Sequence, residues 1–427
     1  MCLNIMHDWF GWLLLLFSFG IVLMWKSIRD DTKVVLAIWF CLVLHHAVAL
    51  LNVYVGAIIG ADVDALNFHA AAVNLAALPE PVWFFGVGNG LVTYIHSLGL
   101  LYRAFGASLI FGGELSVLAF AMSCIVLVKL VDLLDLRRFR VWIILLFGLL
   151  PSAVIFRSAT LRESWQMLFF LLCVYWAIRL RKRSGILIFS FMLMSALCMA
   201  TLHYSLAYYA VYLIAISVYW GILGRKKGVR QMRHLRFLFA GLLVACVIML
   251  TLKMGWYMGV GQALREAENF RLEAVTILGR TTYGAMLDTS SVGGLVNTIP
   301  MVFVQYMFAP FPWQVENVVD ILAMLESMLR IALMFFALSS WRKYSGEVRS
   351  YYCFLLIAVL GMEFVWALGT VNWGTATRHH VPGYSVIVLL GTPGLILFMR
   401  RLHFGIFGRR KVSIFKDREE LDRKSVV

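Results

Sequence analysis

Residues 34–58 read VVLAIWFCLVLHHAVALLNVYVGAI and contain no Asp, Glu, Lys or Arg. An α-helix needs about 20 predominantly apolar residues to cross the hydrocarbon core of a bilayer. This stretch is therefore predicted to be a transmembrane helix, and other apolar stretches along the chain fit the same description. Together they predict an all-α, polytopic membrane protein with about eleven transmembrane helices, at residues 9–25, 34–58, 107–130, 141–156, 163–179, 186–202, 204–223, 236–254, 318–340, 351–370 and 383–400.

The composition of the chain supports the same class of protein. Of its 427 residues, 62% are apolar and 14% are charged, and the mean hydropathy is +0.84. Soluble globular domains carry about 25% charged residues, so this composition excludes a soluble enzyme and a disordered chain. The seven cysteines are scattered singly without a CxxC pair, so neither a disulfide framework nor a zinc site is indicated.

The positions of the basic residues predict the orientation in the membrane. With the N-terminus outside, 29 of the 38 Lys and Arg residues fall in cytoplasmic segments, as the positive-inside rule requires. We therefore expect a multi-pass protein of a bacterial inner membrane with a periplasmic N-terminus and a cytoplasmic C-terminus. Anionic membrane lipids explain the net charge of +15, and nucleic acid is not an expected partner. The basic segments are 26–33, 129–140, 179–183, 225–236, 342–349 and 400–424.

Two long loops lie on the predicted periplasmic side, at about 59–106 and 255–317. Each contains a further apolar stretch, 88–102 and 296–309, which we expect to be an interfacial or re-entrant helix. The organisation is thus an integral-membrane catalytic domain over residues 1–400, followed by a basic cytoplasmic tail over 401–427.

An acidic cluster opens the first of these loops. Asp62 and Asp64 follow the spanning helix 34–58, and an amphipathic helix over 64–78 would place Asp64 and Phe68 on one face. Carboxylates at a helix start are favourable caps, which is the structural alternative. The functional interpretation is a general base, since shielding from water raises the pKa of a carboxyl toward neutrality. Together with His69, the two aspartates could also hold a divalent cation.

Two short turns on the same side carry further polar residues. Arg157, Arg162 and Glu163 crowd into the turn after Pro151. They predict either a structural ion pair or a phosphate clamp, because guanidinium binds phosphate oxygens in a bidentate manner. His203, in the next outer turn, is a candidate site residue or a hydrogen-bonded structural histidine.

The remaining outer segments supply cations and aromatic residues. In the second long loop, Arg280 is a candidate ligand contact, and the Ala309-Pro-Phe-Pro-Trp313 stretch suits a rigid lid that carries Trp313. Before the last helix, Arg378, His379 and His380 form a cationic cluster. It predicts contact with lipid headgroups or a specific lipid-phosphate site.

Several ionisable residues fall inside predicted spans, where they are costly and are usually functional or paired. Glu326 and Arg330 are four residues apart and are expected to form a structural salt bridge. Glu114, Glu363 and the His45-His46 pair also lie at membrane depth.

Because the acidic, arginine, histidine and aromatic clusters all fall on the outer side, we expect one outward-facing cavity there. These motifs resemble the GT-C superfamily of polytopic glycosyltransferases that use polyprenyl-phosphate sugars, especially the bacterial family 39-like members. The helix 34–58 followed by Asp62 and Asp64 is similar to that family's first outer loop, with Phe68 where the family has Tyr. The Pro151 to Glu163 turn is similar to a second family motif.

The resemblance implies that Asp64, or else Asp62, is the general base and that Arg378 or Arg280 holds the lipid phosphate. The chain departs from the family in its additional first helix and in lacking a large C-terminal domain, so the sugar and acceptor stay open. The expected function is an inverting transfer of a sugar or glycan from a polyprenyl-(pyro)phosphate donor to a glycan or lipid-linked acceptor. The alternatives are an O-antigen-type repeat-unit polymerase and a transporter or flippase of lipid-linked sugars.

Overall fold

The computed structural model describes residues 5–56, 62–81, 90–183, 185–223, 260–277 and 281–407. Within these ranges the protein is all-helical, with sixteen α-helices joined by short turns, which confirms the predicted fold class.

Five of the helices are long and apolar enough to cross a membrane. They are α3 (Thr32–Tyr54), α6 (Leu109–Leu133), α15 (Val318–Lys343), α16 (Gly346–Gly369) and α17 (Trp373–Phe407). A sixth crossing results if α7 (Arg140–Leu149) and α8 (Pro151–Arg157), which meet at 67°, form one broken span. The break lies at Pro151, which has no backbone N–H to continue the helix. This is the pattern of a multi-pass membrane protein.

Helices also occupy most of the other predicted spans. They are α1 (Ile5–Leu23), α9 (Glu163–Lys182), α10 (Ile186–Ala200) and α11 (Tyr204–Val218). These helices are shorter or more charged than the first group, so the count of eleven crossings stays a prediction. The predicted span at 236–254 lies outside the described residues.

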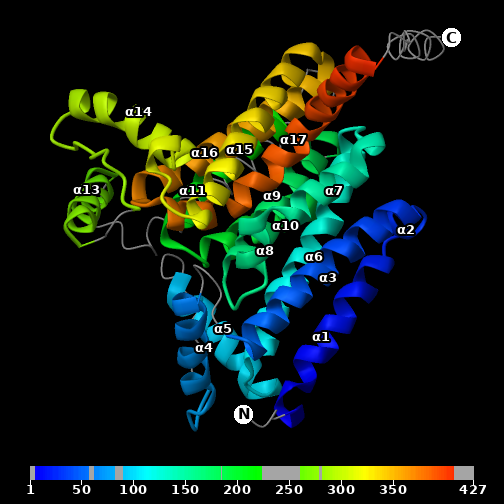
Figure 1. The fold of residues 1–427 in the computed structure, drawn as a ribbon, viewed down its shortest axis with the longest axis vertical. Helices are drawn as coiled ribbons and strands as arrows, with labels where there is room; N and C mark the ends of the chain where they lie inside the picture. Colours follow the sequence, from blue (N-terminus) through cyan, green and yellow to red (C-terminus); the bar gives the residue numbers. More distant parts are fainter. Residues whose placement is uncertain are drawn as a thin grey trace.

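Helix α6 forms the centre of the N-terminal half and packs against α1, α3 and α9. Small residues on α6 let its neighbours approach closely, as in other membrane helix interfaces. At Gly112, for example, an added Cβ would lie 2.6 Å from the hydroxyls of Thr160 and Tyr102. In the C-terminal half, α17 lies along α15 and contacts α16, α7 and α9 (Figure 1), which joins the two halves.

Four helices belong to the two long outer loops: α4 (Asp62–Ala76), α5 (Gly90–Phe105), α13 (Val260–Ile277) and α14 (Val292–Phe308). Figure 1 shows all four away from the C-terminal end of α17. The two apolar stretches predicted to be helical within the loops, 88–102 and 296–309, correspond to α5 and α14.

Arg271 of α13 fixes the second loop to the end of a spanning helix. Its guanidinium donates hydrogen bonds to the carbonyls of Leu368 (3.1 Å), Thr370 (2.8 Å), Ala285 (3.2 Å) and Ala367. The last carbonyls of a helix have no intrahelical partner, so this buried arginine caps α16. Burial lowers the pKa of Arg271 to about 10, which leaves it charged at neutral pH.

The predicted Glu326–Arg330 salt bridge is wrong. The Glu326 carboxylate accepts hydrogen bonds from the backbone N–H (2.7 Å) and the hydroxyl of Ser152 on α8, while Arg330 donates to the Ser327 hydroxyl at 2.7 Å. The start of α8 provides free N–H groups that a carboxylate can satisfy. A contact between two helices therefore replaces the expected pair within one helix.

Two buried histidine–glutamate pairs lie between the helices. His46 Nδ1 is 2.6 Å from Glu114 Oε2, and His380 Nδ1 is 2.6 Å from Glu363 Oε2. All four side chains are at most 5% exposed. Of the residues predicted at membrane depth, Glu114, Glu363 and His46 are therefore paired, as the cost of burying a charge in an apolar interior requires, whereas His45 Nδ1 lies 2.8 Å from the Cys41 carbonyl. His380 was expected in the outer cationic cluster and instead pairs with Glu363.

Candidate functional site

Asp64 lies in the first turn of α4, at the edge of the face that this helix buries. Ala65, Phe68 and Ala72 on that face are at most 8% exposed, which confirms the predicted amphipathic helix. Phe68 packs edge-on against Tyr94 of α5, with ring centroids 5.5 Å apart. The packing leaves the Asp64 carboxylate 44% exposed at the helix start. The side chain of Asp62 lies outside the described residues.

Arg378 lies in the second turn of α17, and the start of that helix is held on two sides. Asn372 caps it by accepting a hydrogen bond from the Thr375 N–H at 2.7 Å. The preceding residue, Val371, accepts a hydrogen bond from the Tyr283 N–H at 2.8 Å. The second outer loop therefore fixes where α17 begins and where Arg378 points.

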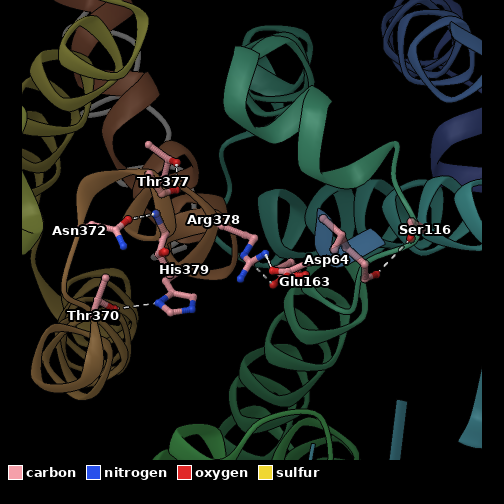
Figure 2. A network of polar contacts seen from close by, with 11 residues as sticks. Asp64, Ser116, Glu163, Thr370, Asn372, Thr377, Arg378 and His379 are labelled. Atoms are coloured by element: carbon pink, nitrogen blue, oxygen red, sulfur yellow. Dashed lines mark hydrogen bonds and ion pairs between the residues drawn. The ribbon is translucent and has the colours of Figure 1, made fainter. Parts of the chain in front are cut away.

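The side chain of Arg378 joins two carboxylates from different helices (Figure 2). Its Nη1 contacts Asp64 Oδ2, and its Nε lies 3.2 Å from Oε1 of Glu163, the first residue of α9. The Glu163 side chain is only 3% exposed. We call Asp64, Arg162, Glu163 and Arg378 the outer cluster. Its two arginines and two acids balance in charge, whereas the sequence predicted a predominantly cationic cavity.

Arg162 is the member of the outer cluster without an ion-pair partner within 4 Å among the described side chains. Its guanidinium carbon lies 5.9 Å from the centre of the Phe68 ring, and its buried Nε makes no hydrogen bond to the described residues. Burial lowers the pKa of Arg162, although nearby Glu163 and Asp64 oppose the shift. A buried N–H group without an acceptor is costly, and a bound anion would supply an acceptor for the Arg162 Nε–H.

The two predicted histidines stack beside the outer cluster. His379 lies flat on Trp366 with ring centroids 3.9 Å apart, and its Nδ1 is 2.8 Å from the Thr370 hydroxyl. His203 packs edge-on against the same tryptophan at 4.5 Å. Its Nδ1 accepts a hydrogen bond from the Ser205 N–H at 3.1 Å and so caps α11. Thr370 and Trp366 had no signal in the sequence, because ordinary helix-end residues gain their role only from this packing.

His203 predicts a pH dependence of stability. Burial and the charges of Arg162 and Arg378 hold the pKa of His203 well below its usual value. Below about pH 6.5 the unfolded chain therefore binds a proton that the folded chain excludes, and stability decreases as the pH falls. Protonation of Nδ1 would also remove the helix cap.

We expect the melting temperature of the purified protein to fall between pH 7.5 and pH 5. The His203→Asn variant, which keeps a cap acceptor without titrating, should show a shallower slope, by up to about 1.4 kcal/mol per pH unit. Equal slopes for the two proteins would show that His203 does not titrate in this range.

Two predicted site residues, Arg157 and Trp313, do not join the outer cluster. Arg157 is fully buried and donates to the Phe147 carbonyl at 2.8 Å while stacking over the Phe147 ring. It lies in the core because residues 151–157 form the helix α8, whereas Arg157 was expected in a tight outer turn. Trp313 is 79% exposed and stacks on Phe311, so it covers no part of the outer cluster. Arg280 lies outside the described residues.

The described residues contain no group of three or more His, Cys, Asp or Glu side chains that could hold a metal ion. Asp64 is engaged by Arg378, and His69 Nδ1 lies 2.8 Å from the Tyr102 hydroxyl. The two side chains thus have separate partners rather than converging on one point.

The chain was compared with known proteins at three levels. No protein-family model, curated protein or solved structure matches it. The similarity of the outer motifs to GT-C glycosyltransferases therefore rests on those motifs alone, and function has to be argued from the outer cluster.

Proposed function

We propose that the protein is a GT-C-like membrane glycosyltransferase acting at the periplasmic face of a bacterial inner membrane, with about eleven spanning helices. It would transfer a sugar or glycan from a polyprenyl-(pyro)phosphate donor to an acceptor hydroxyl during synthesis of a cell-surface polysaccharide or glycoconjugate. The observation that carries the proposal is the guanidinium of Arg162, which has no ion-pair partner among the described side chains, beside an arginine that is shared by two carboxylates.

The outer cluster suits this chemistry because it contains both an anion site and a base. A lipid phosphate would bind Arg162 first and then compete with Asp64 for Arg378, since arginine favours bidentate phosphate contacts. Glu163 would keep its contact with Arg378 Nε and so hold the side chain in place. Release from Arg378 would leave Asp64, the more exposed of the two acids, free to accept a proton.

The transfer itself is a single displacement at the sugar C1 atom. The acceptor oxygen forms a bond to C1 as its proton passes to Asp64, and the bond from C1 to the lipid phosphate breaks. The two arginines stabilise the charge that develops on the departing phosphate, which is the general strategy of preorganised electrostatic catalysis. Configuration at C1 is inverted because the acceptor attacks opposite the leaving group.

Cellular glycans from a deletion strain test this proposal. A single-sugar transferase predicts a truncated glycan that lacks one sugar. Accumulation of complete single repeat units on the lipid would instead indicate the repeat-unit polymerase, which needs the same groups. An unchanged glycan profile would contradict both activities.

The buried histidine–glutamate pairs favour a second candidate, a transporter of lipid-linked sugars. The Ser18 hydroxyl donates to the Leu15 carbonyl, so it has to accept from His46 Nε2–H at 2.8 Å. His380 Nε2–H likewise donates to the Tyr306 carbonyl at 3.1 Å. Each histidine therefore shares one further proton with its glutamate, and protonated sites at membrane depth are typical of transporters. Flux of a lipid-linked sugar in proteoliposomes, without a covalent product, would favour this candidate.

A further inference from the structure

An apolar cavity of about 250 Å³ lies between α5, α6, α9 and α10, next to the outer cluster. Its walls include Tyr94 and Leu98 of α5, Leu115 of α6, Trp165 and Phe169 of α9, and Cys198 of α10. No Asp, Glu, Lys, Arg or His is among the described residues that line it. The cavity is therefore suited to a hydrocarbon chain and not to a charged or strongly hydrated group.

Arg162 does not line this cavity, but two structural connections link it to the cavity walls. Arg162 precedes Trp165 and Phe169 by three and seven residues, so the three side chains share one face at the start of α9. In addition, the guanidinium of Arg162 lies over the Phe68 ring, which contacts the cavity residue Tyr94. Through Phe68, the Arg162 guanidinium thus lies one side chain away from the apolar walls.

The wall formed by α5 is fixed by a close backbone contact. An added Cβ on Gly90, at the start of α5, would lie 2.1 Å from the carbonyl carbon of Leu202. Only glycine fits here, so α5 is held against the turn that carries His203. The same contact therefore positions both the cavity and the histidine beside the outer cluster.

We propose that this cavity binds the hydrocarbon chain of a phosphate-bearing lipid whose phosphate reaches Arg162. The occupant follows from charge complementarity: an uncharged, apolar cavity lies one side chain away from a guanidinium that has no ion-pair partner within 4 Å among the described side chains. The inference rests on the proposed function for the identity of the lipid as the sugar donor. The location of the chain follows from the cavity itself and can be tested without any sugar transfer.

Cys198 provides a native reporter for occupancy, because it lines the cavity as a half-buried free thiol. Cys353 of α16 is a matched control, since it is also half-buried and free but does not line the cavity. The purified full-length protein is treated with N-ethylmaleimide, and alkylation of each cysteine is followed by mass spectrometry. Undecaprenyl phosphate, undecaprenol and inorganic phosphate are the added probes.

We expect undecaprenyl phosphate to slow alkylation of Cys198 and to leave Cys353 unchanged, with little protection by undecaprenol or inorganic phosphate. In the Arg162→Gln variant, protection should need about tenfold more undecaprenyl phosphate, since a charge-assisted hydrogen bond contributes about that factor. If Cys198 reacts too slowly to measure, a Ser97→Cys substitution on the α5 wall in a Cys198→Ser chain serves as the reporter.

Absence of protection at the cavity cysteine would overturn the inference. Equal protection of Cys198 and Cys353, or equal protection by undecaprenol, would overturn it too, because either indicates a general lipid effect. Protection without any sugar transfer would retain the cavity assignment and reject the proposed function. Sugar transfer without protection would retain the proposed function and reject the cavity assignment.

Discussion

Replacing Asp64 by asparagine should lower sugar transfer by about two to four orders of magnitude, the usual contribution of a general base. The amide cannot take up the acceptor proton, although it is close in size to the carboxyl that it replaces. The fold should survive, because Asp64 is 44% exposed and exposed ion pairs contribute only about 0–1 kcal/mol. Transfer is measured with the purified protein, a polyprenyl-phosphate sugar and the acceptor identified from the deletion strain.

Asp62→Asn is the matched control, because it removes a carboxyl from the same turn of α4. It should retain most of the activity if Asp64 is the base. Wild-type product from Asp64→Asn would contradict the assignment, and loss of activity only in Asp62→Asn would move the role to the second aspartate.

Replacing Arg378 by alanine should have the largest effect on stability. The substitution leaves Glu163, 3% exposed, without its cation, and removing one member of a buried pair costs about 3–5 kcal/mol. It would also remove one of the two proposed phosphate ligands, so transfer should be lost as well. The measurement is the melting temperature of the detergent-solubilised protein, alongside the transfer assay.

A paired substitution separates the two effects of Arg378. The Arg378→Met, Glu163→Gln double variant removes both charges, so it should recover most of the stability and still fail to transfer sugar. Arg378→Ala as stable as the wild type would show that the Arg378–Glu163 contact does not support the fold.

The helices were predictable because hydropathy is a local property. Most of the stretch 34–58 lies in α3, which ends at Tyr54, and the amphipathic pattern after Asp64 lies in α4, since each pattern falls within one element. The break at Pro151 was not predicted, because 141–156 was expected to be a single span, although proline cannot continue the hydrogen bonds of a helix. The contacts of Arg157 were not predictable either, because they depend on how α8 turns back into the core.

For the outer cluster, the sequence predicted only that its residues lie on the same side of the membrane and not which of them are in contact. Asp64 and Arg378 are 314 residues apart, so no local pattern joins them, and only the distribution of basic residues placed both on one side. The Glu326–Arg330 prediction failed for a related reason. Helical spacing favours that pair by only a few tenths of a kcal/mol, and Ser152, 174 residues from Glu326, offers two hydrogen bonds instead.

The proposed chemistry requires the outer cluster to face the periplasm, which cysteine labelling tests most directly. A membrane-impermeant maleimide is added to membrane vesicles that contain chains without native cysteines and with either Asp64→Cys or Ser345→Cys. Ser345 lies between α15 and α16, on the predicted cytoplasmic side. The account predicts labelling of Asp64→Cys in right-side-out vesicles and of Ser345→Cys only in inside-out vesicles. Labelling of Asp64→Cys only in inside-out vesicles would contradict it.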